Sequence, residues 1–268
     1  MSGPKENLAV LVVSCDQYSD LWEPFFSLFW RFWPDCPFNV YLLSNKLSAN
    51  IPRVMTLLTG DDISWSDSLY KGVSQLEQHY VLLFLDDLFL YDFVKTAKVL
   101  EVLNWILESG ANYVRLNPSQ RPDKAFNELV GIVSKGTIYR TSTVLSVWKK
   151  EVLLDLLKPG ESAWNFEIYG SIRSDDYDGF YSTWKNQFPT INSVIKGEWR
   201  RDAVKKCRSL GVEIDLTKRT VMNPMRATVF SLKRLRTKLL NLFPARHRRK
   251  IKDFVLRGKY KGNPKLKT

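Results

Sequence analysis

Short apolar runs alternate with helical patterns over the first 120 residues, and this alternation limits the possible folds more than any other feature of the sequence. A continuous apolar run rich in β-branched residues is typical of a strand buried on both faces. Strands that alternate with helices indicate a mostly parallel sheet that helices cover. The expected strands are residues 8–15, 38–44, 54–58, 80–85 and 112–116.

Amphipathic patterns between and after these strands predict the helices. The sequence contains neither GxGxxG nor GxxxxGK[ST], so a Rossmann dehydrogenase and a P-loop kinase are both poor interpretations. We therefore predict the α/β class, with a Rossmann-like, mostly parallel central sheet flanked by helices. The expected helices are residues 20–33, 67–78, 93–109 and 147–157, and a further strand is expected at 137–143.

Charge divides the chain into two parts. The 268 residues include 40 Lys and Arg against 28 Asp and Glu, a formal net charge of +12. Residues 218–268 hold 17 of the cations and one acid, Asp253, whereas residues 1–217 carry a net charge of −4. Such asymmetry points to an anionic partner for the basic part. We expect a folded domain at residues 1–217 and a basic helical extension at residues 218–268.

The basic extension has the pattern of an amphipathic helix. Between residues 228 and 243, apolar side chains recur at helical spacing among Lys and Arg. Because such helices bind membrane surfaces, we expect residues 226–260 to contact an anionic membrane. The alternative is a helix that packs on the domain with its basic side in solvent. Nucleic acid is not expected as a partner, because the tail lacks interleaved aromatic residues and the body is acidic.

The cysteines and the apolar segments indicate a compartment. Cys15, Cys36 and Cys207 have the spacing of neither a disulfide framework nor a zinc site. Residues 1–13 lack the pattern of a signal peptide, and no apolar run is long enough for a transmembrane helix. We therefore expect a cytoplasmic protein that binds peripherally at the inner face of the cytoplasmic membrane.

An acidic pair, Asp86–Asp87, follows the most apolar of the expected strands. Adjacent carboxylates there are costly unless they are neutralised, and a Mg²⁺ or Mn²⁺ ion that also binds phosphate would neutralise them. A solvated turn is the alternative. Because ligands of parallel sheets bind beyond the carboxyl ends of the strands, Asp16 after the first strand is another candidate.

Two further segments combine acids with aromatic residues. Asp61, Asp62 and Trp65 precede an expected helix and could hold a nucleotide base or ribose, although helix capping explains them equally well. Residues 159–171 are rich in Trp, Tyr, Gly and Glu. Aromatic faces suit sugar rings, and a carboxylate beside them can remove a proton from a hydroxyl group. The alternative is a packed loop in which Glu167 forms a salt bridge with a neighbour such as Arg173.

Taken together, these features resemble glycosyltransferases of the GT-A fold, and more narrowly the small bacterial transferases of lipopolysaccharide and capsule gene clusters. The resemblance covers roughly residues 8–215. It rests on an N-terminal strand, a strand that ends in Leu85–Asp86–Asp87 and a later segment through Glu167. The supporting strings are Tyr113–Pro118 (YVRLNP), Tyr139–Ser142 (YRTS), Val147–Leu154 (VWKKEVLL), Pro159–Glu167 (PGESAWNFE) and Gly170–Arg173 (GSIR).

The resemblance implies roles for individual residues. Asp86 and Asp87 match the DXD-type motif that binds a divalent cation and the donor diphosphate, although Leu88 stands at the third place. Glu167 matches the carboxylate that deprotonates the acceptor in inverting members, and Glu161 is the second candidate. The residues that fall where the nucleotide usually lies are Asp16, Asp61, Asp62 and Trp65.

We therefore expect a nucleotide-sugar-dependent hexosyltransferase that moves a sugar, for example from a UDP-sugar, to a lipid-linked glycan acceptor. If Glu167 is the base, the anomeric configuration inverts. A sugar-phosphate nucleotidyltransferase also needs a metal beside a phosphate, but the sequence lacks the Gly-rich N-terminal phosphate loop of that class. A non-enzymatic, basic-tailed membrane or nucleic-acid binding module would leave the acidic pair and Glu167 without a role.

Overall fold

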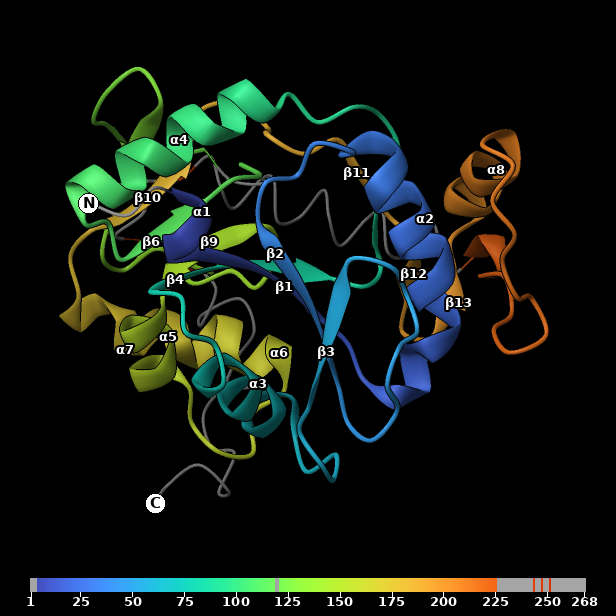
Figure 1. The fold of residues 1–268 in the computed structure, drawn as a ribbon. Coiled ribbons are helices and arrows are strands. Elements are labelled where there is room, and N and C mark those ends of the chain that lie inside the picture. The colour runs from blue at the N-terminus through green and yellow to red at the C-terminus, as the bar shows by residue number, and fades with distance from the viewer. Residues whose placement is uncertain (1–3, 119–120, 226–242, 244–246, 248–250, 252–268) are drawn as a thin grey trace.

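A nine-stranded sheet forms the centre of the described part of the chain, residues 4–118, 121–225, 243, 247 and 251 of a computed structural model (Figure 1). Strands β1 to β4 pair in parallel, and so do β6 and β10, whereas β9 and β8 run in the opposite direction. The expected α/β architecture with a mostly parallel central sheet is therefore confirmed. The spatial order is β3 (Val54–Leu58), β2 (Asn39–Ser44), β1 (Leu8–Val13), β4 (Tyr80–Leu85), β9 (Ser146–Lys149), β6 (Tyr113–Arg115), β10 (Phe180–Thr183), β8 (Val130–Ile132) and β7 (Lys124–Ala125).

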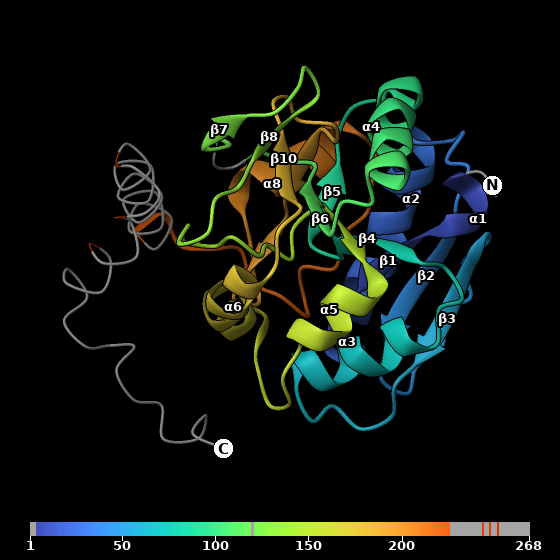
Figure 2. The same cartoon turned by 90° about the vertical axis from the view of Figure 1, so that its left-hand side faces the viewer.

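Helices cover both faces of this sheet, which is thus the middle of three layers (Figures 1 and 2). Within β1, Val10 and Val12 belong to the core under α2 and α4, whereas Ala9 and Leu11 belong to the core above α3 and α5. Successive side chains of a strand point to opposite faces, so a strand buried on both sides is apolar throughout. The first face carries α1 (Pro4–Asn7), α2 (Trp22–Phe32) and α4 (Thr96–Ser109), and the second carries α3 (Trp65–Ser74) and α5 (Lys150–Leu156).

The aromatic side chains of α2 fix this helix on the sheet. The rings of Phe25 and Phe29 meet Phe84 of β4 at centroid distances of 6.2 and 5.7 Å. The helix ends at Phe32, because the residue before Pro34 is driven out of the helical region. Helix α4 ends at Gly110, whose φ of 65° is the left-handed conformation that glycine adopts easily.

Residues 137–143 differ from the sequence-based prediction. They form turns and bends rather than a strand, and the strand of this region, β9, begins only at Ser146. Tyr139 and Leu145 have φ values of 52° and 44°, a left-handed conformation that is incompatible with an extended strand. The edge of the sheet is formed by the antiparallel β7–β8 hairpin.

After β10 the chain returns to the end of β4. Met222 N donates to Trp199 O over 2.8 Å and Trp199 N donates to Thr220 O over 2.9 Å, so residues 218–222 pack on the body. Thr220 and Met222, which fall within the expected basic extension, are thus hydrogen-bonded to the described body. The elements of this return are β11 (Thr190–Asn192), which pairs with β5 (Leu88–Leu90) just after β4, the pair β12 (Val194–Ile195) and β13 (Glu198–Trp199), and α8 (Arg201–Ser209).

Most of the expected membrane-binding segment, residues 226–260, lies outside the described residues. Within the part of the chain that is described, no helix has both the length and the apolar character needed to cross a membrane.

Candidate functional site

The carboxyl edge of the sheet brings together segments that are far apart in the sequence. Strands β1, β4 and β6 end there, and the antiparallel β9 begins there, because Ser146 is paired with both Leu83 and Arg115. The residues just after β1 and β4, and those just before β9, must therefore lie at this edge. This is where ligands of parallel sheets bind.

The acidic pair forms the turn that joins β4 to β5. Ser14 Oγ donates a hydrogen bond to Asp86 Oδ2 and accepts one from Trp22 Nε1 over 2.7 Å. The backbone carbonyl of Asp87 accepts from the amide and hydroxyl of Ser193, at 2.6 and 2.9 Å. These bonds hold the turn from both sides: they position the carboxylate of Asp86 and the backbone of Asp87.

Burial dominates the electrostatics of this turn. It raises the pKa of Asp86 well above its usual value, with a further rise from the negative charge of Asp87, and it raises the pKa of Asp87 to about 7. Asp87 Oδ1 is one of the buried side-chain oxygens of the described residues that have no hydrogen-bond partner. Leaving such a group unpaired is unfavourable, so the turn would be stabilised by a cation.

A divalent cation fits this donor set. Within the described ranges no three His, Cys, Asp or Glu side chains converge as a complete metal site. Mg²⁺, however, is commonly held by one or two carboxylates, with phosphate oxygens and water in the other positions. Asp86 and Asp87 supply two carboxylates, and Oδ1 of Asp87 has no competing partner. These two residues would therefore hold the ion.

Arg219 is a part of this region that sequence reasoning missed. Its guanidinium pairs with Asp20 in two hydrogen bonds, Nε–Oδ2 of 2.7 Å and Nη2–Oδ1 of 3.0 Å, and stacks on the Tyr18 ring at 4.0 Å. Burial raises the pKa of Asp86, and the positive charge of Arg219 offsets a part of that rise. In the sequence Arg219 stands among the basic residues of the expected tail, so nothing local distinguished it.

Asp16 joins the loop after β1 to the loop after β2. Its carboxylate accepts hydrogen bonds from the backbone amides of Asn45, Lys46 and Leu47, at 3.0 to 3.2 Å. The Asp16 amide in turn donates to Asn45 Oδ1 over 3.1 Å. Backbone amides thus occupy the carboxylate of Asp16, and these hydrogen bonds hold the two loops together.

The other expected nucleotide residues lie between the end of β3 and the start of α3. Asp61 is exposed and pairs with Lys46 at 2.6 Å, and Asp62 is also exposed. Trp65 begins α3, where Ser64 is the N-cap, and its ring lies 5.6 Å from the ring of Phe166. The Trp65 ring thus connects the start of α3 with the segment that carries Glu167.

Glu161 has a structural partner. Its fully buried carboxylate forms two hydrogen bonds with Arg173, Nη1–Oε1 of 2.9 Å and Nη2–Oε2 of 2.7 Å. The pairing expected as an alternative for Glu167 is therefore made by Glu161. This ion pair ties the loop before α6 (Ala163–Asn165) to α7 (Ser171–Arg173).

Glu167 lies in a π-helical turn, η2 (Phe166–Gly170), between α6 and α7. Its Oε1 accepts from Ser142 Oγ at 3.2 Å, Thr143 N at 3.0 Å and Thr143 Oγ1 at 3.3 Å. Because residues 142–143 precede β9, Glu167 lies at the carboxyl edge of the sheet. Burial raises the pKa of Glu167, while these hydrogen bonds and the charge of Arg115 lower it.

The loop that holds Glu167 is itself constrained. Arg115 ends β6, is 2% exposed, and donates from Nη2 to Tyr139 O over 2.6 Å. Tyr139 and Leu145, at the two ends of the loop, have the left-handed φ values given above. Left-handed residues other than glycine and inserted π turns both occur often at functional sites. The sequence did not single out Arg115 either, because Arg115 lies within an expected strand.

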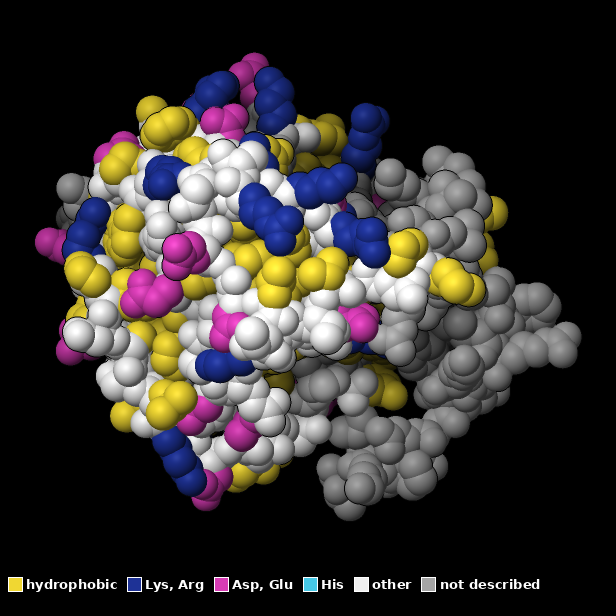
Figure 3. Space-filling view, turned by 90° about the vertical axis from the view of Figure 1, so that its right-hand side faces the viewer, with side chains coloured by type: hydrophobic (Ala, Val, Ile, Leu, Met, Phe, Trp, Pro, Cys, Tyr) yellow, Lys and Arg dark blue, Asp and Glu magenta, His cyan; other side chains and the backbone are white. Residues whose placement is uncertain are grey.

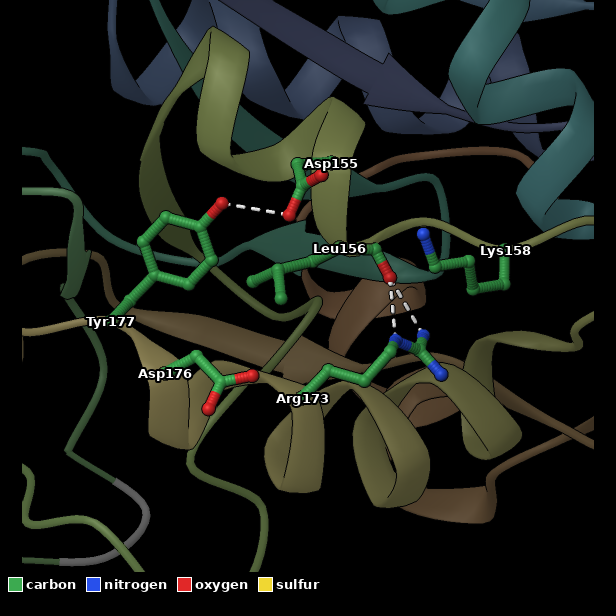
Figure 4. Close-up of a pocket in the computed structure, with 6 residues that line it drawn as sticks. All are labelled: Asp155, Leu156, Lys158, Arg173, Asp176 and Tyr177. Carbon is green, nitrogen blue, oxygen red and sulfur yellow. Dashed lines mark hydrogen bonds between the residues drawn. The ribbon is translucent and has the colours of Figure 1, made fainter.

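A separate hollow of about 430 Å³ lies beside α5, α7 and η3 (Ser174–Asp176) (Figure 4). In it, Arg173 donates to Leu156 O, and the Tyr177 hydroxyl donates to Asp155 Oδ2 over 2.7 Å. None of the residues expected to carry chemistry lines this hollow, so we place the candidate site at the sheet edge. The lining residues are Asp155, Leu156, Lys158, Arg173, Asp176 and Tyr177.

Comparisons with known proteins give structural similarities only. No protein-family model and no curated protein sequence matches the chain. Among solved structures, it is similar to S. aureus TarS 1–349 in complex with UDP, with 14% identity, a TM-score of 0.48, and coverage of 68% of this chain and 59% of that one. The chain thus spans less than two thirds of that TarS fragment.

Two further similar structures come from different enzyme classes. The mannosyltransferase PcManGT from Pyrobaculum calidifontis, in complex with GDP-Man and Mn²⁺, has 10% identity and a TM-score of 0.46 over 74% of this chain and 60% of its own. UTP-bound UGPase from Acinetobacter baumannii has 12% identity and a TM-score of 0.49 over 85% and 98%. At these values none of the similarities establishes a family or a substrate.

Proposed function

We propose that this chain is a nucleotide-sugar-dependent glycosyltransferase of the GT-A type that transfers a sugar to a hydroxyl group with inversion. The observation that carries the proposal is the buried turn Asp86–Asp87, in which Asp87 Oδ1 has no hydrogen-bond partner. A cation would stabilise this turn when its carboxylates are ionised, and a cation at the carboxyl edge of a parallel sheet is suited to a nucleotide diphosphate.

The residues around the turn suggest how the donor would bind. Asp86 and Asp87 would hold Mn²⁺ or Mg²⁺, which supplies positive charge to the donor diphosphate. The loop pair fixed by Asp16 borders the same edge, and Asp61, Asp62 and Trp65 are the candidates for contacts with the base and ribose. A UDP-sugar is the first donor to test.

Glu167 would act on the acceptor. Its Oε1 is fixed by Ser142 and Thr143, and its raised pKa suits a group that accepts a proton near neutral pH. The acceptor oxygen would attack the anomeric carbon while the bond to the diphosphate breaks. The hydroxyl proton would pass to Glu167, and the electron pair would leave with the diphosphate. One displacement of this kind inverts the anomeric configuration.

The enzymatic alternative is a sugar-phosphate nucleotidyltransferase. Its nucleophile is a phosphate oxygen that is already ionised at neutral pH, so it needs no general base. The oriented, half-buried carboxylate of Glu167 therefore favours transfer to a hydroxyl group. A purely binding role would leave both the acidic turn and Glu167 unexplained.

The acceptor and the location belong to the same proposal. A lipid-linked glycan of a bacterial surface polysaccharide, such as lipopolysaccharide or capsule, would be met at the cytoplasmic membrane. The basic residues within 226–260 would hold the enzyme there.

The test combines ligand binding with product analysis. Thermal-shift screening of nucleoside diphosphates and nucleotide sugars, with and without Mn²⁺, should reveal stabilisation that Asp87→Ala abolishes. With the donor so found, a nucleoside diphosphate released in step with a new glycoside supports the proposal. Pyrophosphate release from a nucleoside triphosphate and a sugar phosphate would instead show the nucleotidyltransferase.

A further inference from the structure

The exposed side of α8 is a row of cations. Arg201, Lys205 and Arg208 are exposed and stand at positions i, i+4 and i+7 of the helix, whereas Ala203, Val204 and Cys207 form its buried side. Residues at this spacing lie on one helix face. Asp202 is the acid of this helix, and it is paired with Arg200, which stands just before the first residue of α8. The exposed face is therefore left with positive charge.

This arrangement is unfavourable for the helix by itself. Like charges four residues apart repel, and a cation in the first turn, such as Arg201, opposes the helix dipole. Among the described residues, neither Lys205 nor Arg208 has an ion-pair partner. Only Arg208, in the last turn, is favoured by the dipole. Helix stability thus does not account for the row, and an anionic partner would.

The surface next to α8 combines further cations with exposed apolar side chains. Lys206 lies 5.3 Å from the Tyr91 ring, and Arg31 of α2 donates to Leu210 O just beyond α8. Tyr91 is 38% exposed, and Phe93, two residues further along the chain, packs on Phe32 of α2 and is 62% exposed. Figure 3 looks onto this side of the molecule and shows Lys and Arg side chains gathered in its upper half.

The basic extension leaves the body at the same place. Arg201 Nε donates to Met222 O over 3.1 Å, so the chain is still held at the start of α8 three residues before Met225. Met225 is 78% exposed. The described residues that precede the cationic extension are therefore attached beside the cations of α8.

We propose that the α8 face, formed by Arg201, Lys205 and Arg208 with the neighbouring Phe93, binds the surface of an anionic lipid bilayer. Cations beside exposed apolar side chains are the combination that binds membrane interfaces, where the cations meet lipid headgroups and the apolar groups enter the acyl boundary. The face would orient the folded body on the membrane, a role that an extension alone cannot perform. The proposal does not depend on the transfer reaction, because its readouts are binding and labelling.

The experiment compares three full-length proteins: the wild type, Lys205→Glu/Arg208→Glu, and the control Lys124→Glu/Lys158→Glu. The control changes the net charge equally, at exposed positions on β7 and after α5. Binding is measured by sedimentation with phosphatidylcholine vesicles that contain about 30% phosphatidylglycerol, and with pure phosphatidylcholine vesicles. We expect the α8 variant to lose at least roughly 30-fold in affinity for the anionic vesicles and the control to change much less.

A second measurement uses the wild type only, so it does not depend on how the variants fold. Acylation of lysines, read by mass spectrometry, should fall at Lys205 when anionic vesicles are added and should not change at Lys158. Equal losses of affinity in the two variants, or unchanged labelling of Lys205, would overturn the proposal. So would an α8 variant that loses affinity for RNA while it binds vesicles normally, which would identify a nucleic-acid surface.

Discussion

Arg219 and Asp20, which are 199 residues apart, form a buried ion pair beside the acidic turn, with side chains that are 9% and 3% exposed. The pair ties the last described segment of the body to η1 (Asp16–Leu21), the turn that follows β1. It therefore closes the region that contains Ser14 and Asp86, and it does so with a residue that the sequence places in the basic tail.

Arg219→Ala should destabilise the body strongly. The substitution leaves Asp20 as an unpaired buried charge, and such losses cost about 3–5 kcal/mol. Urea unfolding at neutral pH measures the change. Arg200→Ala, which removes the more exposed pair with Asp202, should cost less than about 1 kcal/mol. Similar losses in both variants would mean that the Arg219 pair is not the closing contact.

Asp87→Asn should stabilise the protein at pH 8. Asp87 holds its proton up to about pH 7 in the folded state, whereas the unfolded chain releases it near 3.8. The contribution of Asp87 to stability is therefore fully present below pH 3.8 and is lost as the pH rises to about 7. Above pH 7 the variant should be more stable by about 1–3 kcal/mol, after allowance for the buried amide.

Thermal unfolding between pH 4 and pH 8 tests this expectation. The advantage of Asp87→Asn should disappear near pH 4, and Asp62→Asn, at an exposed position, should show no such dependence. Added Mn²⁺ should raise the melting temperature of the wild type at pH 8 but not that of Asp87→Asn. If Mn²⁺ stabilises both proteins equally, the ion binds elsewhere.

Glu167→Gln should remove transfer and keep donor binding. An oriented general base contributes about 10²–10⁴-fold to the rate, so kcat should fall by that factor while the donor affinity changes little. Because burial raises the pKa of Glu167, the acid limb of the wild-type pH–rate profile should lie above the usual range of a glutamate. A near-normal kcat for Glu167→Gln would exclude this residue as the base.

Glu161→Gln should behave differently from Glu167→Gln. It leaves the Arg173 guanidinium without its charged partner, which should cost about 3–5 kcal/mol in the free energy of unfolding. At a temperature where the variant is folded, kcat should be close to that of the wild type. A large loss of kcat without a loss of stability would move the role of base to Glu161.

Most strands and helices could be predicted from the sequence, because a buried segment shows a local pattern of apolar residues. The run at residues 80–85 is β4 to the residue, and the aromatic stripe after Asp20 forms α2. The position of Asp86 at the carboxyl edge follows from the same pattern, because a parallel strand brings its end to that edge. The strand predicted at residues 137–143 was wrong, because a pattern of side-chain types does not reveal the left-handed backbone of Tyr139 and Leu145.

The partners of the charged groups were decided only by the tertiary structure. Nothing near Glu161 in the sequence favours Arg173 for it rather than for Glu167, and nothing near Arg219 distinguishes it from its basic neighbours. The sequence determined which segments are buried, because hydrophobicity acts on each segment by itself. Only the fold decided which charges meet, because an ion pair depends on two segments reaching the same place with compatible geometry.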